Sequence, residues 1–391
     1  MSSQEPYIGI FNDSFPPIID GVTLTVLNYA DKFMQRKENI CVVTPYNPIK
    51  VEVPYKVMRY FSLPIRSRKP YRYGYPKLDP YIWRKLRETP FKIIHSHSPF
   101  AAGRLGVYAK RKQGIPLIGT FHSKYKSDLT HSFKLMPFCV PIIMKRILNF
   151  YRACDEVWIP QAAVEETVRE YGFEGEVYVM ENGNDFADVS WNYIDKIKNR
   201  NQHPDSPKLN LLFVGQHIWE KGIGIIADAL SIISDKIDFE MFFIGEGYAK
   251  EDLKKKIEQL GLTDKVRFIG VTNDREVLKE YYGKADLFLF PSKYDNAPLV
   301  VREAAAMGTP AIIPSGSTAS EVIKNRENGF LIEDSPEAYA AEIIRLSGNY
   351  NEIDACGRRA KDTLVKSWDD VIDEVYGRYE NLMASYSNKQ H

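Results

Sequence analysis

The chain has 391 residues, of which 44% are apolar and 26% charged, and its formal net charge is +1. This length and ordinary globular composition predict two compact cores and exclude the fibrous and disordered classes. The four cysteines are far apart and form no CxxC pair, which argues against structural zinc and against a disulfide framework.

The N-terminal segment Met1–Pro6 lacks the basic and apolar regions of a signal peptide. The longest apolar stretch, Leu135–Met144, contains two prolines and is about half as long as a membrane span. We therefore expect a cytoplasmic protein.

In the first half of the chain, short apolar runs rich in β-forming residues alternate with amphipathic helical stretches such as Thr23–Lys37 and Ala162–Tyr171. This alternation predicts an α/β fold with a parallel sheet. The predicted strands are Tyr7–Phe11, Ile40–Pro45, Lys92–Ser96, Pro116–His122, Glu156–Ile159 and Val177–Met180.

The second half repeats the alternation, and the polar, proline-containing segment Asn199–Pro207 predicts the boundary between the halves. We therefore expect two doubly wound, Rossmann-like domains. The predicted strands here are Leu209–Gly215, Phe239–Gly245, Val266–Gly270, Asp286–Pro291, Pro310–Pro314 and Gly329–Ile332.

Residues that follow strands are the strongest candidates for ligand binding, because open parallel sheets bind ligands beyond the carboxyl ends of their strands. Gly21 precedes a predicted helix, where its N–H could approach an anion, although a plain turn glycine is the simpler interpretation. Lys221 lies at the start of another helix, where a diphosphate would meet an ammonium group and the helix dipole. An exposed helix-start lysine is the alternative.

The segment Tyr294–Pro310 carries Asp295 and Glu303 with seven residues between them. It resembles the paired-acid signature of family-4 glycosyltransferases, which have the GT-B fold. Lys221 in VGQHIWEKG and His122 in GTFHSKY match further motifs of that family, and the matches cover about residues 7–375 in order.

The resemblance implies GT-B domains at residues 1–195 for the acceptor and 206–365 for a nucleotide-sugar, with residues 366–391 as a helix that crosses back to the first domain. It implies that Glu303 binds both ribose hydroxyls, a role suited to an ionised carboxylate. The other implied donor-site or catalytic residues are His122 near the anomeric centre, Asp295 on a sugar hydroxyl, Lys221 and Gly21 on the diphosphate, and Gln216, Leu299 and Val300.

Three positions depart from the family pattern. Gln216 replaces a common arginine, and Asp295 stands where glutamate is usual. Pro298 cannot donate a backbone N–H to phosphate, so Leu299 and Val300 must do so.

The resemblance further implies a retaining transfer of a hexose, glucose or galactose, from a UDP-linked donor, with no cofactor. No two aspartates have the Asp-x-Asp spacing of metal-dependent sugar transferases, so we expect no metal requirement. A nucleotide-sugar epimerase of the same fold, or a binding protein without turnover, are the alternatives.

Residues 50–154 contain 22 basic and 4 acidic residues, a net charge of +18, which suggests an anionic partner. Basic and aromatic residues interleave in Ile65–Lys77 and His131–Arg152, a composition that suits a lipid headgroup surface, although a core helix with solvated charges explains the second stretch equally well. The expected membrane or acceptor residues are Arg66, Arg68, Lys69, Arg72, Lys145 and Arg146.

Among family-4 branches, the segments around His122 and Asp295 look closest to bacterial diacylglycerol glucosyltransferases. We therefore expect a membrane-lipid acceptor and a peripheral location on the inner face of the cell membrane. A polysaccharide or lipopolysaccharide precursor is the alternative acceptor. The sugar-site motifs argue against nucleic acid as a partner.

Overall fold

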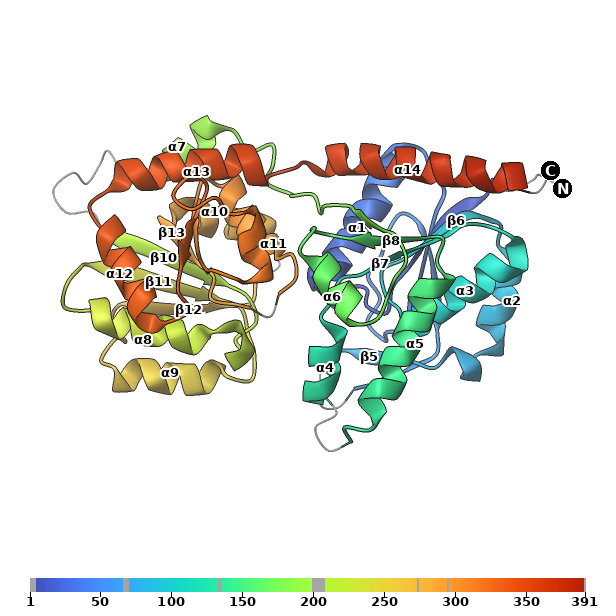
Figure 1. Ribbon diagram of the computed structural model, residues 1–391, viewed down its shortest axis with the longest axis horizontal. Helices are drawn as coiled ribbons and strands as arrows, with labels where there is room; N and C mark the ends of the chain where they lie inside the picture. Colours follow the sequence, from blue (N-terminus) through green and yellow to red (C-terminus); the bar gives the residue numbers. More distant parts are fainter. Residues whose placement is uncertain are drawn as a thin grey trace. The chain divides into compact units, whose positions relative to one another are not determined.

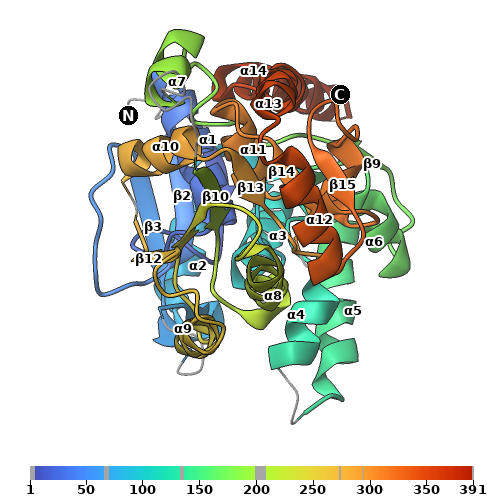
Figure 2. The same cartoon turned by 90° about the vertical axis from the view of Figure 1, so that its left-hand side faces the viewer.

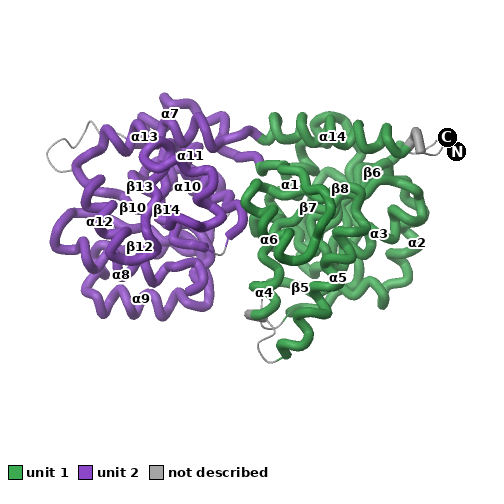
Figure 3. The backbone as a smooth tube through the Cα atoms, viewed as in Figure 1, with its two compact units in different colours: residues 1–182, 368–391 green, residues 183–367 purple. Residues whose placement is uncertain are grey.

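The computed structural model describes residues 5–65, 70–132, 136–198, 208–272, 274–293 and 295–389. The chain folds into two compact units, Met1–Asn182 with Trp368–His391, and Gly183–Ser367 (Figure 3). The predicted linker Asn199–Pro207 lies outside the described residues.

The first unit contains a parallel sheet of seven strands in the order β3-β2-β1-β6-β7-β8-β9 (Figure 1). The order reverses between β1 and β6, so the loops that follow these two strands flank the switch point where doubly wound sheets bind ligands. The strands are β1 (Tyr7–Phe11), β2 (Ile40–Pro45), β3 (Lys56–Tyr60), β6 (Phe91–Ser96), β7 (Leu117–Thr120), β8 (Glu156–Ile159) and β9 (Val177–Val179), and a separate antiparallel pair comprises β4 (Ser62–Pro64) and β5 (Arg72–Gly74).

Helices cover both faces of this sheet because successive residues of each buried strand point to opposite sides. Ile8 and Ile10 of β1 pack in one apolar cluster with the C-terminal helix, whereas Phe11 packs in the other. The helices are α1 (Gly21–Gln35), α2 (Pro80–Glu88), α3 (Ala101–Gln113), α4 (Tyr125–Ser132), α5 (Cys139–Ala153), α6 (Val164–Glu170) and α14 (Trp368–Lys389), with a 3-10 turn η1 at Pro76–Leu78.

The second unit contains a parallel sheet of six strands in the order β12-β11-β10-β13-β14-β15, with its switch point between β10 and β13. In Figures 1 and 2, α8 and α9 lie on the opposite side of this sheet from α7 and α13. The strands are β10 (Leu209–Val214), β11 (Phe239–Ile244), β12 (Val266–Gly270), β13 (Leu287–Leu289), β14 (Ala311–Pro314) and β15 (Phe330–Ile332). The helices are α7 (Trp191–Lys198), α8 (Ile223–Ile233), α9 (Lys250–Gln259), α10 (Arg275–Lys284), α11 (Leu299–Ala306), α12 (Pro336–Leu346) and α13 (Tyr350–Leu364), with 3-10 turns η3 (Trp219–Lys221) and η4 (Thr318–Val322).

The α/β class, the two parallel sheets and the GT-B architecture expected from the sequence are confirmed. All twelve predicted strands are present, with small differences at their ends. The strands β3, β4 and β5 were not predicted. β3 contains Lys56 and Arg59 at a sheet edge, and β4 and β5 have three residues each, so none forms the apolar run of a central strand.

Residues 183–195 pack with the second unit, whereas the sequence analysis placed them in the first domain. The reason is local: α7 contacts α10, and Lys198 Nζ donates a hydrogen bond of 2.6 Å to the carbonyl of Gly308. Helix α14 packs with the first unit, where Trp368, Val371 and Tyr379 enter the apolar cluster around β1.

Candidate active site

Lys221 and Asp295 meet in the second unit because their loops follow neighbouring strands, β10 and β13. Lys221 is the last residue of the turn η3. The next residue, Gly222, has a φ of 73°, a left-handed conformation that favours glycine. A Cβ atom at Gly222 would lie 2.8 Å from the Cβ of Pro291, so glycine also allows the two loops to approach. The ammonium of Lys221 donates to Oδ1 of Asp295.

The second carboxylate oxygen of Asp295, Oδ2, is buried and accepts no hydrogen bond from the described residues. A buried acceptor without a donor is costly, by about 1–3 kcal/mol. This oxygen is therefore well suited to accept a hydroxyl from a ligand that enters beside Lys221.

Helix α11 begins at Leu299, a few residues after Asp295, and no side chain caps its N-terminus. The N-cap residue is Pro298. The first N–H groups of a helix lack partners within the helix, and the helix dipole makes this end positive. The backbone of Leu299 and Val300 therefore offers donors to an anion.

Glu303 lies one turn further along α11 and is buried, with 8% of its side chain exposed. Arg275 Nη2 donates to its Oε1 at 2.7 Å, and the hydroxyl of Tyr282 donates to its Oε2 at 2.8 Å. Burial raises the pKa of Tyr282 well above its ordinary value, so this phenol keeps its proton. The Glu303 carboxylate is thus held by one cationic and one neutral donor.

Gln216 is exposed and offers only its carbonyl to the loop, where Ile218 N donates to it at 3.0 Å. The next residue, His217, is fully buried against Phe213, Phe243 and Phe268, and neither ring nitrogen has a hydrogen-bond partner among the described residues. Burial lowers the pKa of His217 to about 4. His217 is therefore neutral at pH 7.

In the first unit, His122 follows β7 and His97 follows the neighbouring strand β6. Their rings stack, and Nδ1 of His97 lies 3.0 Å from Nε2 of His122. Burial lowers the pKa of His122 to about 4, so the ring is a neutral dipole at pH 7. His95 is a structural residue, because its two nitrogens bond to Tyr379 and Thr120 at 2.6 Å.

Gly21 is the first residue of α1 and is exposed. The preceding residue, Asp20, is the N-cap, and its Oδ1 accepts from Thr23 N at 2.7 Å. The second oxygen of Asp20 accepts from the hydroxyl of Tyr71. The N-terminus of α1 thus already has a carboxylate, and an anion could reach it only beside Asp20.

The residues expected at an acceptor or membrane surface differ in their environment. Arg66, Arg68 and Lys69 lie outside the described residues. Arg72 bonds to Ser62 across the β4–β5 pair, which leaves its guanidinium with a structural role. Lys145 and Arg146 are exposed on α5, together with the apolar side chains of Phe138 and Ile142, which are 67% and 53% exposed.

Sequence reasoning missed Arg275, Tyr282 and Asp185 as neighbours of the candidate residues, and it left His97 out of catalysis. His97 carried a signal, because it follows a predicted strand in the motif HSHSPF. Arg275 and Tyr282 carried none, because their contacts with Glu303 join two helices and are visible only once α10 packs on α11.

Comparison with known proteins accounts for both halves of the chain. Residues 19–188 match the model described as Glycosyltransferase Family 4, and residues 194–363 match the model described as Glycosyl transferases group 1. The chain belongs to the family-4 glycosyltransferases. This glycosyltransferase contains no helix, among its described residues, with the length and apolarity needed to cross a membrane.

Individual relatives are named for different sugars, glucose and mannose. The glycosyltransferase is 23% identical to alpha-monoglucosyldiacylglycerol synthase of Streptococcus pneumoniae, over 83% of this chain and 74% of the relative. It is 22% identical to GDP-mannose-dependent alpha-mannosyltransferase of Corynebacterium glutamicum, over 96% and 89%. The Anabaena protein HepE, crystallised with UDP and glucose, has the same fold, with a TM-score of 0.74, 18% identity and coverage of 96% and 99%.

Proposed function

We propose that this glycosyltransferase moves a hexose, glucose or galactose, from a UDP-linked donor to a membrane lipid such as diacylglycerol, at the cytoplasmic face of the membrane. The observation that carries the proposal is the ion pair of Lys221 and Asp295 in front of the N-terminus of α11. The relatives that glucosylate diacylglycerol support the lipid acceptor.

In this proposal the second unit binds the donor. Lys221 and the N–H groups of Leu299 and Val300 neutralise the departing diphosphate, and Oδ2 of Asp295 accepts a hydroxyl of the sugar. These groups are positioned before the reaction, so they stabilise the developing charge with little reorganisation. Glu303 accepts the ribose hydroxyls.

The first unit supplies the catalytic His122 and the acceptor surface. A neutral imidazole stabilises positive charge on the sugar through its dipole without adding a positive charge of its own. The His97 contact orients this ring. We further propose that the transfer retains the anomeric configuration and needs no metal.

Glu303→Ala tests the donor site. We expect it to abolish binding of UDP in calorimetry, because it removes a charged acceptor whose hydrogen bonds contribute about 1.5–3 kcal/mol each. Thermal unfolding of the variant serves as the control for folding. Unchanged UDP affinity in a folded variant contradicts the ribose role of Glu303.

The lipid acceptor predicts reversible binding to anionic vesicles. Each basic residue near an anionic leaflet contributes about 1 kcal/mol, so Lys145→Glu with Arg146→Glu should weaken co-sedimentation with phosphatidylglycerol vesicles at least tenfold, and salt should weaken that of the wild type. The matched control reverses two exposed lysines of the second unit, Lys255 and Lys284. Equal loss in both double variants, or no binding at low salt, contradicts the membrane contact.

Enzymatic product analysis separates the acceptors. Incubation of the protein with UDP-glucose or UDP-galactose should release UDP much faster with diacylglycerol vesicles than without them. Faster release with a soluble saccharide would favour a polysaccharide acceptor instead. Conversion of the donor to another nucleotide-sugar without an acceptor would indicate an epimerase.

A further inference from the structure

We propose that Arg275 is a positioning residue for the donor: it orients the Glu303 carboxylate for the ribose, and it is itself fixed by Asp185. The proposal rests on the ribose role of Glu303 proposed above. It assigns to Arg275 a function that acts through Glu303, without contact with the reacting atoms.

The geometry is a chain of two ion pairs within the second unit. Arg275 is the first residue of α10, and its Nη2 lies 2.7 Å from Oε1 of Glu303 and 3.0 Å from Oδ2 of Asp185. One guanidinium nitrogen thus bridges two carboxylates that are 118 positions apart in the sequence. Such a bridge fixes Arg275 and Glu303 relative to the segment that contains Asp185.

Several contacts fix the residues around Asp185. The guanidinium lies over the ring of Phe186, with its carbon 4.4 Å from the ring centre, and Phe186 is buried. The backbone N–H of Phe186 donates to Oδ1 of Asn184 at 2.7 Å, and Asn184 N donates to the carbonyl of Lys366 at 2.9 Å. Arg275 is therefore held by the ring of Phe186 on one face of its guanidinium and by the carboxylate of Asp185.

The two hydrogen bonds to Glu303 leave room for a ligand on the same carboxylate. Arg275 Nη2 donates to one of its oxygens and the hydroxyl of Tyr282 donates to the other. An ionised carboxylate has about four acceptor positions, so these two donors leave capacity for two ribose hydroxyls.

Arginine is the residue suited to this role. Its guanidinium offers five donors in a fixed plane and stays charged when buried, whereas a lysine ammonium is a compact point charge on a flexible stem. Glu303 and Asp185 raise the pKa of Arg275 although its burial acts in the opposite direction. Lysine at this position should hold one carboxylate but not both.

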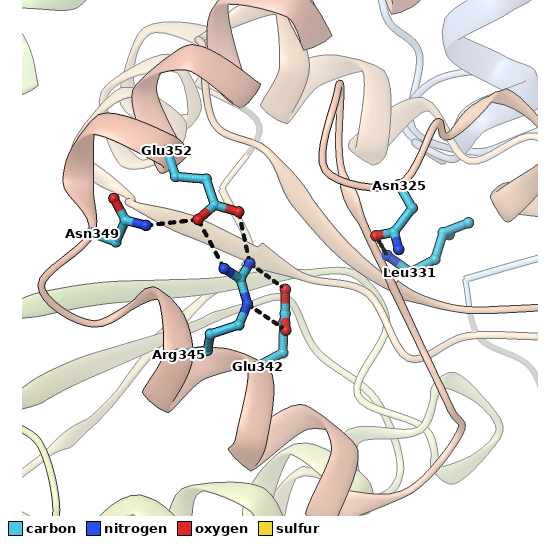
Figure 4. A network of polar contacts seen from close by, with 6 residues as sticks. All are labelled: Asn325, Leu331, Glu342, Arg345, Asn349 and Glu352. Atoms are coloured by element: carbon cyan, nitrogen blue, oxygen red, sulfur yellow. Dashed lines mark hydrogen bonds and ion pairs between the residues drawn. The ribbon is translucent and has the colours of Figure 1, made fainter.

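The test compares Arg275→Gln with Arg345→Gln as a matched control. Arg345 also bridges two carboxylates in the second unit, those of Glu342 and Glu352 (Figure 4), and it also lies over an aromatic ring, that of Phe330 at 5.8 Å. It connects α12 and α13 and contacts none of the candidate donor residues. Both variants thus lose an ion-pair bridge, but only Arg275→Gln loses a contact with Glu303.

The measurement is the affinity for UDP, and for GDP in parallel, by calorimetry. We expect the wild type and Arg345→Gln to bind about equally. Arg275→Gln should bind about tenfold more weakly, because the Glu303 carboxylate is no longer oriented for the ribose. Arg275→Lys should lie between the two.

Each outcome decides the matter. If Glu303→Ala loses nucleotide binding and Arg275→Gln keeps wild-type affinity, Arg275 has no positioning role while the proposed donor site stands. Tighter binding by Arg275→Gln shows that Arg275 competes with the ribose, which also overturns the proposal. If Glu303→Ala binds UDP and GDP as the wild type does, both proposals fall. If Arg275→Gln does not fold, the affinity of Arg275→Lys gives the answer, because wild-type affinity in that variant overturns the proposal.

Discussion

At the scale of single residues, the candidate site is built from ion pairs. Lys221 pairs with Asp295, and Arg275 pairs with both Glu303 and Asp185. A diphosphate that binds Lys221 exchanges the ionic contact of Lys221 with Asp295 for a contact with phosphate. The net gain from each contact is therefore smaller than the strength of the contact itself.

Lys221→Met should show what the ammonium contributes. We expect the rate of UDP release from the donor to fall about a hundredfold or more, because the departing diphosphate loses a pre-placed cation. Affinity for UDP should fall, whereas affinity for uridine should not. Lys256→Met is the control, because Lys256 of α9 forms a similar ion pair with Asp228 of α8. If Lys221→Met weakens the affinity for uridine as much as the affinity for UDP, the substitution has changed the conformation of the loop and not only its charge.

At the scale of elements, the sequence predicted best what is buried and regular. Central parallel strands such as β1 and β10 are apolar on both faces, so they stand out as short apolar runs. The edge strand β3 does not stand out, because Lys56 and Arg59 interrupt it. Lys221 and Asp295 were found because their loops follow strands and because their motifs resemble a known family.

The remaining part of the site depends on packing that has no sequence pattern. Arg275 reaches Glu303 only because α10 lies against α11, and His97 reaches His122 only because β6 and β7 are neighbours. The N-cap of α1 is a further example, because Asp20 occupies the helix end at which Gly21 was expected to meet an anion. A sequence can indicate where a helix begins, but it does not show which side chain caps the N-terminus of that helix.

Helix α14 should contribute strongly to the stability of the first unit. Tyr379 is fully buried, stacks on Phe33, and bonds to His95 through its hydroxyl. Tyr379→Ala should reduce the free energy of unfolding by about 3–5 kcal/mol, as for other buried aromatic truncations. Tyr379→Phe should cost about 1–3 kcal/mol, because it leaves a buried ring nitrogen of His95 without its hydrogen-bond partner. Asn381→Ala, an exposed change on the same helix, should have no measurable effect in denaturant titrations.

At the scale of the whole molecule, buried histidines link stability to pH. The pKa of His122 and that of His217 are both lowered to about 4 by burial, and burial also lowers the pKa of His95 and of His97. The unfolded chain therefore takes up protons more readily than the folded one. Their contribution to stability is complete above about pH 6.5 and is lost as the pH falls towards 4.

His217→Leu isolates one of these contributions. The wild type should lose about 2 kcal/mol more than the variant between pH 7 and pH 4.5, since one pKa unit corresponds to about 1.4 kcal/mol. For a unit of this size, that difference lowers the midpoint of thermal unfolding by about 5 °C. Parallel midpoint curves for the two proteins would show that His217 does not titrate differently on folding.

The placement of α14 also has a consequence for biosynthesis. The ribosome makes the residues of the first sheet early, but Trp368, Val371 and Tyr379, which complete the cluster over β1, are made after the entire second unit. Residues 183–367 form an uninterrupted stretch and can close as they emerge, since domains generally fold as units during synthesis. The nascent first unit must meanwhile keep Ile8, Val26 and Phe33 without their final cover. The part of the protein that is translated first is thus the last to be finished, and its unfinished apolar face is what chaperones would meet.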